Sequence, residues 1–298
     1  MSTNNLPPTL QELLQNYKTQ LSDLYSTSEI DYIFFTLASK AFQKDKSILR
    51  TALNARWSDF AQKRLFLDSA LFQLQSGTPY QYVVGETEFL GMRIFLNPSV
   101  LIPRPETEEL AEKLIKQITK MHGSGFNGSV IDVCTGSGVL ALAVKKAFPD
   151  ARVIALDISE DALEVAKNNA LYHHLHIEFL QQDFLSIDMS DMPYFDFIVS
   201  NPPYIPQSEK SEMSPVVVNH EPHQALFVED QNPFIFYRQL YDLALASLRP
   251  KGKLWVEIHQ DKHEALVKIY EEYFAQVIPH KDYSGNWRFL EISKPITC

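Results

Sequence analysis

Residues 130–157, VIDVCTGSGVLALAVKKAFPDARVIALD, decide the fold of this 298-residue chain. They predict a strand over 130–134, a glycine-containing turn, a helix over about 139–148 and a second strand over 152–156. This order of elements is typical of two parallel strands joined by a crossover helix. Glycines in the turn let the backbone approach a ligand closely, and the start of the helix offers free N–H groups.

The same alternation of strands and helices continues to the end of the chain. Helices are predicted over 160–172, about 233–248 and about 262–275, and strands over 176–180, 195–200 and 252–258 and near 277 and 288. Strands that alternate with helices predict an α/β fold, with a mostly parallel sheet and helices on both of its faces.

The chain before this region has a different pattern. Apolar residues recur at spacings of three and four over 10–76, which predicts four or five helices, the last ended by Gly77. Residues 80–100 are rich in β-formers and predict a hairpin that connects two domains. The prolines within 101–109 predict an extended segment that leads into a helix through about Lys120. The predicted division is a helical domain over 1–78, a connecting β-hairpin over 79–100 and an α/β domain over 101–298.

The composition is that of a folded globular protein, with 45% hydrophobic and 21% charged residues. No stretch has the ~18 uninterrupted apolar residues of a membrane span, and the N-terminus lacks the basic and apolar regions of a secretory signal. The two cysteines, Cys134 and Cys298, form neither a disulfide framework nor a zinc cluster, and no metal site is expected. We therefore predict a soluble, cytoplasmic protein that does not associate with a membrane.

The charge is unevenly distributed. Residues 1–85 carry eight basic and seven acidic side chains, net +1, whereas the remaining residues carry 19 basic and 30 acidic side chains, net −11. Proteins that bind nucleic acid usually concentrate basic charge, because phosphate contacts supply much of their affinity. An acidic surface also simply favours solubility, so this observation disfavours a nucleic-acid substrate without naming another.

Polar residues follow the first three predicted strands of the α/β region. Asp132 precedes Cys134-Thr135-Gly136-Ser137-Gly138, Asp157 ends the second strand, and Asp183-Phe184 follows the third. A carboxylate at the position of Asp157 can accept hydrogen bonds from both hydroxyls of a ribose. Asp183 can accept one from the amino group of an adenine, with the Phe184 ring against the base. The spacing of Gly136, Gly138 and Ala141 also fits a loose dinucleotide fingerprint. This segment alone therefore allows either a dinucleotide or S-adenosylmethionine.

The strand over 195–200 ends in Ser200-Asn201-Pro202-Pro203-Tyr204, and this motif favours methyl transfer. Two prolines remove two N–H donors and fix the backbone, so the turn presents a rigid set of acceptors. The side-chain oxygen of Asn201 and the carbonyl of Pro202 can hold an –NH2 group with its lone pair toward a methyl donor. Such acceptors stabilise the positive charge that develops on the nitrogen, while Tyr204 supplies an aromatic wall.

With these motifs the chain resembles the HemK/PrmC family, which methylates a glutamine side chain in peptide-chain release factors. Asn-Pro-Pro-Tyr is shared with adenine methyltransferases, so further segments carry the resemblance. They are 77–82 with Gly85, Phe89 and Gly91; 100–108; Glu221-Pro222 with Ala225-Leu226; Tyr237-Arg238; Glu257-Ile258; and Asp282, Gly285 and Arg288. The matches extend from about 77 to 292, and the helical domain agrees in size and character only.

The resemblance implies a Rossmann-like class I methyltransferase sheet with a late antiparallel strand, which binds S-adenosylmethionine and releases S-adenosylhomocysteine. It implies that the donor lies against Cys134, Thr135, Gly136, Ser137, Gly138, Asp157, Asp183, Phe184 and Asn201. It implies that Asn201, Pro202, Pro203 and Tyr204 bind the glutamine, with Asn201, Pro202 and Tyr204 as catalytic residues.

The chain departs from the family pattern at three places. Cys134 and His259 stand where glycine is common, and Glu229-Asp230-Gln231-Asn232 replaces a Gly-Asp-Gly stretch. We expect Cys134 to be tolerated because the strand has not yet turned there, and we expect His259 to be a satisfied surface histidine.

The expected function is methylation of N5 of the glutamine in the Gly-Gly-Gln motif of release factors, by a monomer whose N-terminal helices help to dock the factor. The main alternative is an N6-adenine methyltransferase acting on DNA or RNA, which calls for a basic cleft and an aromatic clamp. A release-factor-binding module without catalysis would not need Asp157 or the motif at 201–204. An NAD-dependent oxidoreductase lacks an obvious proton donor.

Overall fold

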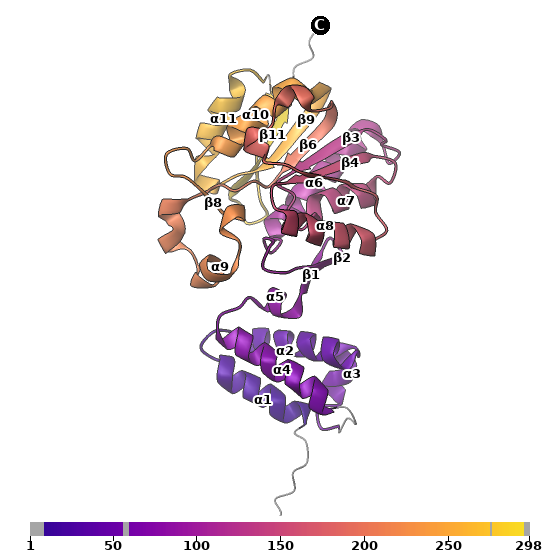
Figure 1. The fold of residues 1–298 in the computed structure, drawn as a ribbon, viewed down its shortest axis with the longest axis vertical. Helices are drawn as coiled ribbons and strands as arrows, with labels where there is room; N and C mark the ends of the chain where they lie inside the picture. The colour runs from indigo at the N-terminus through magenta and orange to yellow at the C-terminus, as the bar shows by residue number, and fades with distance from the viewer. Residues whose placement is uncertain (1–8, 56–59, 275, 295–298) are drawn as a thin grey trace, which may run out of the picture. The chain divides into compact units, whose positions relative to one another are not determined.

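The computed structural model describes residues 9–55, 60–274 and 276–294, so Cys298 lies outside the described residues. The chain divides into two compact units, Met1–Gly85 and Glu86–Cys298, each of which is described by itself (Figure 1).

The first unit is helical. Its helices are α1 (Leu10–Leu21), α2 (Thr27–Phe42), α3 (Lys46–Thr51), α4 (Phe60–Gln75) and α5 (Tyr80–Val84). Thr9 with Glu12 and Ser26 with Glu29 form capping boxes that fix the starts of α1 and α2. Their apolar faces enclose one core around Tyr17.

The β-rich segment after α4 begins as a helix, not as the predicted strand. Residues 80–84 form α5, which starts after Pro79 and ends at Gly85, whose φ is +77°. Val84 is buried in the core of the helical unit, so tertiary packing overrides the strand preference of a β-branched residue. The hairpin itself is shorter than predicted and consists of β1 (Glu86–Phe89) and β2 (Met92–Phe95), paired antiparallel.

The second unit is built on a seven-stranded sheet. Its strands are β3 (Ser129–Val133), β4 (Arg152–Asp157), β5 (Glu178–Gln181), β6 (Phe195–Ser200), β9 (Leu248–Glu257), β10 (Gln276–Lys281) and β11 (Trp287–Ser293). Their order is β10-β11-β9-β6-β3-β4-β5; β11 pairs antiparallel with both β10 and β9, and the other neighbouring strands pair in parallel. The predicted mostly parallel sheet with a late antiparallel strand is confirmed.

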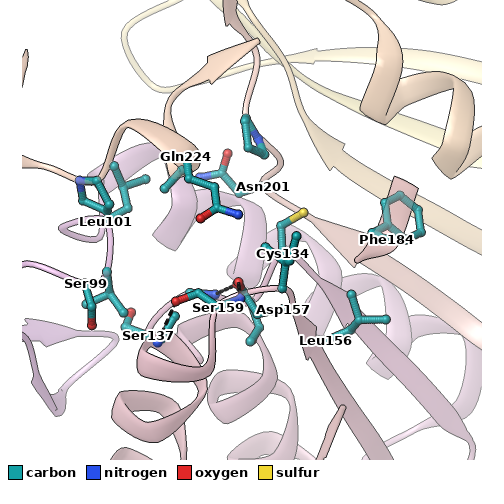
Figure 2. Close-up of a pocket in the computed structure, with 18 of the residues that line it drawn as sticks. Ser99, Leu101, Cys134, Ser137, Leu156, Asp157, Ser159, Phe184, Asn201 and Gln224 are labelled. Atoms are coloured by element: carbon teal, nitrogen blue, oxygen red, sulfur yellow. Dashed lines mark hydrogen bonds between the residues drawn. The ribbon is translucent and has the colours of Figure 1, made fainter. Parts of the chain in front are cut away.

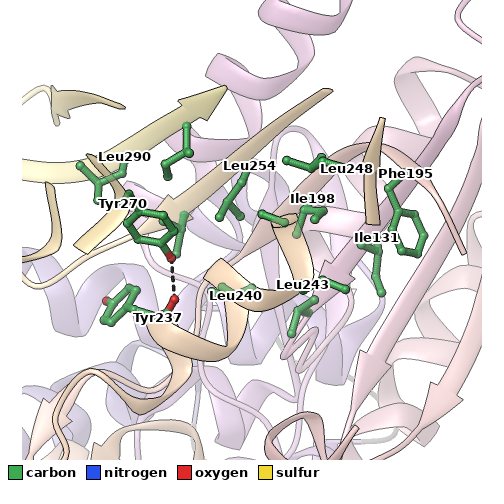
Figure 3. Close-up of a cluster of buried hydrophobic side chains, with 14 of the residues drawn as sticks. Ile131, Phe195, Ile198, Tyr237, Leu240, Leu243, Leu248, Leu254, Tyr270 and Leu290 are labelled. Carbon is green, nitrogen blue, oxygen red and sulfur yellow. Dashed lines mark hydrogen bonds between the residues drawn. The ribbon is translucent and has the colours of Figure 1, made fainter. Parts of the chain in front are cut away.

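Helices cover both faces of this sheet. They are α6 (Pro105–His122), α7 (Val139–Ala147), α8 (Glu160–Tyr172), α10 (Ile235–Ser247) and α11 (His263–Glu271). Helix α7 contacts α6 and α8, whereas α10 contacts α11 (Figure 1). Under α10 and α11 lies a core to which β3, β6, β9 and β11 contribute side chains (Figure 3). In this core the Tyr270 hydroxyl donates to the carbonyl of Tyr237 at 2.8 Å.

One excursion from the sheet has no counterpart in the sequence prediction. Between β6 and α10 the chain forms β7 (Ile205–Pro206), the 3₁₀ turns Gln207–Glu212 and His223–Ala225, α9 (Pro215–His220) and β8 (Phe227–Val228). Strands β7 and β8 pair in parallel. The remaining short turns are Phe184–Ser186, Met189–Asp191 and Gln260–Lys262.

Candidate active site

A cavity of about 520 Å³ lies at the carboxyl ends of β3, β4, β5 and β6. This is the edge at which open α/β sheets bind ligands, and the volume is within the range of small-molecule sites. Of the predicted site residues, its wall includes Cys134, Thr135, Gly136, Ser137, Asp157, Asp183, Phe184, Asn201 and Pro203. Gly138, Pro202 and Tyr204 are not on this wall.

The turn after β3 needs residues with left-handed backbone. Gly136 has a φ of +54° and Gly138, the N-cap of α7, a φ of +86°. A Cβ atom at Gly138 would lie 3.0 Å from the Cβ of Ala166, so this glycine allows α7 to pack closely on α8. Cys134 also has a positive φ, +61°. The expectation that the strand has not yet turned at Cys134 is therefore wrong, because the turn begins at this residue.

Asp132 is a fully buried carboxylate beneath this turn. Its Oδ2 accepts hydrogen bonds from the Thr135 hydroxyl at 2.6 Å and from the Ala141 N–H at 3.1 Å. Its Oδ1 is buried and has no hydrogen-bond partner among the described residues. Burial raises the pKa of Asp132 to about 7, despite the two hydrogen bonds. A buried carboxylate oxygen without a partner is costly unless a ligand supplies a donor or a positive charge.

Asp157 joins the turn to the next strand. One carboxylate oxygen accepts the N–H of Gly136 at 2.8 Å, and the other accepts the N–H of Ser159 at 3.0 Å (Figure 2). Burial raises the pKa of Asp157. Because each carboxylate oxygen has two lone pairs, both oxygens can still accept from the hydroxyls of a ligand.

Asp183 and Phe184 lie on the cavity wall beyond β5. Both carboxylate oxygens of Asp183 bond within its own turn, to the Leu185 N–H at 3.0 Å and the Ser186 hydroxyl at 2.7 Å. Phe184 is 3% exposed and belongs to the core of the sheet. This pair therefore forms a rigid part of the wall.

Asn201 follows the end of β6, and the nitrogen of its side-chain amide is hydrogen-bonded within the protein. Its Nδ2 donates to the Thr107 hydroxyl at 3.1 Å, so Oδ1 is the atom left to accept from a ligand. Tyr204 does not form the predicted aromatic wall of this cavity. Its hydroxyl donates to Oε1 of Glu257 at 3.2 Å, and the residue lines a second cavity of about 300 Å³.

Two segments line the main cavity that were not among the predicted site residues. Ser99, Val100, Leu101 and Pro103 come from the stretch before α6, and Pro222, Gln224, Ala225 and Phe227 come from the excursion after β6. In Figure 2 the side chain of Gln224 lies close to that of Asn201. The sequence held a signal for both segments, because each overlaps a stretch that carries the family resemblance.

A buried carboxylate ties these two segments together. Glu221 has a side chain that is 1% exposed, and it pairs with Arg104 at 2.6 Å. The same carboxylate accepts the N–H of Ile102 at 3.2 Å. The excursion and the stretch before α6 are thereby fixed to each other on one side of the cavity.

The departures from the family pattern have local partners. The Nε2 of His259 lies 3.1 Å from Oε2 of Glu209, and its Nδ1 accepts the N–H of Asp261 at 3.2 Å. Asp230 accepts from the N–H and the hydroxyl of Ser208, at 2.9 and 2.8 Å. These contacts position the excursion beside the second cavity.

Neither a metal cluster nor a membrane-spanning helix is found among the residues that the structure describes. Within residues 9–55, 60–274 and 276–294, no group of three or more His, Cys, Asp or Glu side chains is arranged to hold a metal ion. No helix in the same part of the chain is long and apolar enough to cross a membrane.

Comparison with known proteins decides the family. The methyltransferase small domain model matches residues 106–221. A protein of Flavobacterium psychrophilum named release factor glutamine methyltransferase is 36% identical over 94% of this chain and 99% of its own length. One of the same name from Bacteroides thetaiotaomicron is 34% identical over 93% of this chain and 97% of its own length. The chain belongs to the release factor glutamine methyltransferase family.

Solved structures agree on the fold of this family member. A methyltransferase from Pyrococcus furiosus has a TM-score of 0.51 with 19% identity, over 70% of this chain and 91% of its own. This likeness shows the fold. The named relatives and the matching family model show that the protein is a methyltransferase, and such enzymes use S-adenosylmethionine as the methyl donor. The unpaired Oδ1 of Asp132 fits that donor, because its methionine part carries a cationic amino group that would satisfy a buried carboxylate.

Proposed function

We propose that this protein transfers a methyl group from S-adenosylmethionine to the side-chain amide nitrogen, N5, of the glutamine in the Gly-Gly-Gln motif of peptide-chain release factors. The observation that carries the proposal is the whole-length similarity to release factor glutamine methyltransferases, together with an amide oxygen of Asn201 left open at the donor cavity.

The donor is held by residues at the ends of three strands. The amino group of its methionine part would satisfy the buried, unpaired Oδ1 of Asp132 beneath the turn, and residues 134–137 line the part of the cavity where the methionine part would lie. Asp157, Asp183 and Phe184 line the same cavity; Asp157 would accept from the ribose hydroxyls, and Asp183 and Phe184 would contact the adenine. Gly138 does not line the cavity; it contributes by allowing α7 to pack closely on α8.

The acceptor nitrogen is positioned by two oxygen atoms. Asn201 Oδ1 and the carbonyl of Pro202 each accept one N–H of the glutamine amide, which points the nitrogen lone pair at the donor. S-adenosylmethionine supplies an electrophilic methyl group, and its sulfur keeps the electron pair of the broken C–S bond. The amide nitrogen gains positive charge as the N–C bond forms, and the two acceptors stabilise that charge. Alignment of the two reactants supplies the rest of the acceleration, and the proton leaves to water after transfer.

The alternative, N6-adenine methylation of nucleic acid, is not favoured. Relatives that cover 93–95% of the chain are named for release factors, and residues 86–298 carry a net charge of −11. Action as a monomer in the cytoplasm, with the helical unit docking the factor, remains part of the proposal.

Two variants test the proposal together. Purified release factor, tRNA and DNA are incubated separately with the protein and methyl-labelled S-adenosylmethionine. We expect label in the release factor only. Asn201→Ala should keep the donor Kd and lose most of the turnover, whereas Asp157→Ala should weaken the donor. A release factor whose Gly-Gly-Gln glutamine is replaced by alanine is the matched control. Label that persists in this control, or that enters nucleic acid instead, would contradict the proposal.

A further inference from the structure

A buried chain of polar groups continues from Asn201 into the protein. Asn201 Nδ2 donates to Thr107 Oγ1 at 3.1 Å, and Thr107 Oγ1 donates to Glu257 Oε2 at 2.9 Å. The other oxygen of Glu257 accepts from the Tyr204 hydroxyl at 3.2 Å. Thr107 is 3% exposed and Glu257 2% exposed. These side chains come from α6, β9 and the turn after β6, which are distant in sequence.

The carboxylate of Glu257 sets the direction of every hydrogen bond in this chain. An ionised carboxylate only accepts, so the single proton of the Thr107 hydroxyl must point to Glu257. The Thr107 oxygen then faces Asn201 with its lone pairs, and only the –NH2 end of the amide can bond to it. Asn201 Oδ1 is consequently the end that is left for a substrate.

The opposite amide orientation would oppose the proposed reaction. With Nδ2 toward the substrate, two –NH2 groups would face each other and neither could accept. The nitrogen of the substrate would lose one of the two acceptors that stabilise its developing charge. Because the two ends of an amide have nearly the same shape, packing alone does not choose between the orientations.

We propose that Thr107 and Glu257 are positioning residues, which hold the Asn201 amide with Oδ1 toward the glutamine of the substrate. This inference rests on the proposed function and deepens it: Thr107 lies on the wall of the donor cavity, and both Thr107 and Glu257 act on the substrate through the Asn201 amide. It also gives a reason for a buried carboxylate at the end of β9, which is otherwise unfavourable.

The ionisation state of Glu257 decides whether the hydrogen bonds of this chain have a fixed direction. Burial raises its pKa to about 7, and the hydrogen bond from Thr107, the charge of Arg288 and the hydrogen bond from Tyr204 oppose the rise. Glu106 on α6 adds to the rise. The Tyr237 hydroxyl from α10 donates to the main-chain carbonyl of Glu257, not to the carboxylate. Below pH 7 a protonated Glu257 can donate to Thr107, and the direction of the chain is no longer fixed.

The first test removes the hydroxyl and then restores it. We expect Thr107→Val to lower kcat on release factor roughly tenfold, the equivalent of one hydrogen bond, with the donor Kd and the KM for the factor little changed. Thr107→Ser should recover most of that loss. Thr119→Val is the matched control, because the Thr119 hydroxyl on the same helix bonds only to the Ile115 carbonyl, on the exposed side. It should behave as wild type.

The second test uses pH at saturating donor. The kcat of wild type should fall as pH drops through about 7. Glu257→Gln should have a lower kcat that does not decrease further over this pH range. The inference is overturned if Thr107→Val keeps wild-type kcat, if Thr107→Ser fails to recover, or if the kcat of Glu257→Gln still falls over this pH range. All of these comparisons require wild-type transfer to the glutamine. A wild-type protein that does not methylate it would instead refute the proposed function.

Discussion

At the scale of single residues, the burial of Asp132 beneath the turn lowers the stability of the folded protein. Its pKa is raised to about 7 in the folded protein by burial, above its ordinary value of 3.8. The folded state therefore loses stability as pH rises from about 4 to 7, where the unfolded chain ionises freely and the buried group does not. In the proposed complex, the cationic amino group of the donor would offset this cost, but only for the ionised carboxylate.

Replacement of Asp132 by asparagine should separate stability from binding. At pH 8 we expect Asp132→Asn to be more stable by on the order of 1 kcal/mol, because a neutral amide is less costly to bury, and to bind S-adenosylmethionine more weakly. In wild type the donor Kd should rise as pH falls through about 7, and this pH dependence should vanish in the variant. Thermal unfolding measures the stability and calorimetric titration measures the donor Kd, each from pH 6 to 8. A variant that is less stable than wild type and binds S-adenosylmethionine with the same Kd would disprove this role.

Cys134 has a left-handed backbone, which the glycine common at this position in the family could have indicated. A side chain at a φ of +61° is strained by about 1–2 kcal/mol relative to glycine. Cys134→Ala and Cys134→Gly both remove the thiol, so their difference isolates the backbone. We expect the glycine variant to be more stable than the alanine variant by about 1 kcal/mol in denaturant titrations. Equal midpoints would show that the turn carries no such strain.

At the scale of elements, the strands and helices of the sheet could be predicted, while the pairing and contacts of the segments that close the site could not. The alternation from 130 to 293 follows from local periodicity, and the motif positions follow from the ends of β3, β4 and β6. The excursion over 205–228 has short elements whose pairing, β7 with β8, depends on contacts distant in sequence. The contact between Thr107 and Glu257 spans 150 residues, and no local pattern indicates it.

The pair of Arg104 and Glu221 should control how long the donor stays bound. Glu221→Ala removes the carboxylate that holds the two cavity-lining segments together, so we expect the dissociation rate of S-adenosylhomocysteine to rise roughly tenfold, as for the loss of one charge-assisted hydrogen bond. Glu178→Ala breaks the exposed pair with Arg152 in the same unit and should leave the rate unchanged. Stopped-flow displacement compares them. Equal rates in the two variants would mean that the pair does not hold the segments at the cavity.

At the scale of the whole molecule, the two units have separate cores, and the donor residues all belong to the second. A ligand stabilises the unit that binds it, by about 2.7 kcal/mol at a hundredfold excess over Kd. In hydrogen–deuterium exchange with S-adenosylhomocysteine, we therefore expect new protection within Glu86–Cys298, around β3, β4 and β6, and none in α1 to α4. Asp157→Ala at the same concentration should show less protection. Protection of α1 to α4 would show that the units are coupled.

The proposed reaction delivers one methyl group to one glutamine nitrogen. The most direct measurement is peptide mass spectrometry of a release factor after incubation with this protein and S-adenosylmethionine, with fragmentation that localises the modification. We predict the mass of a single methyl group on the glutamine of the Gly-Gly-Gln motif, and an unmodified peptide when the protein carries Asn201→Ala. An unmodified glutamine in the presence of active wild-type protein, with the methyl group found on nucleic acid or on another residue, would contradict the account.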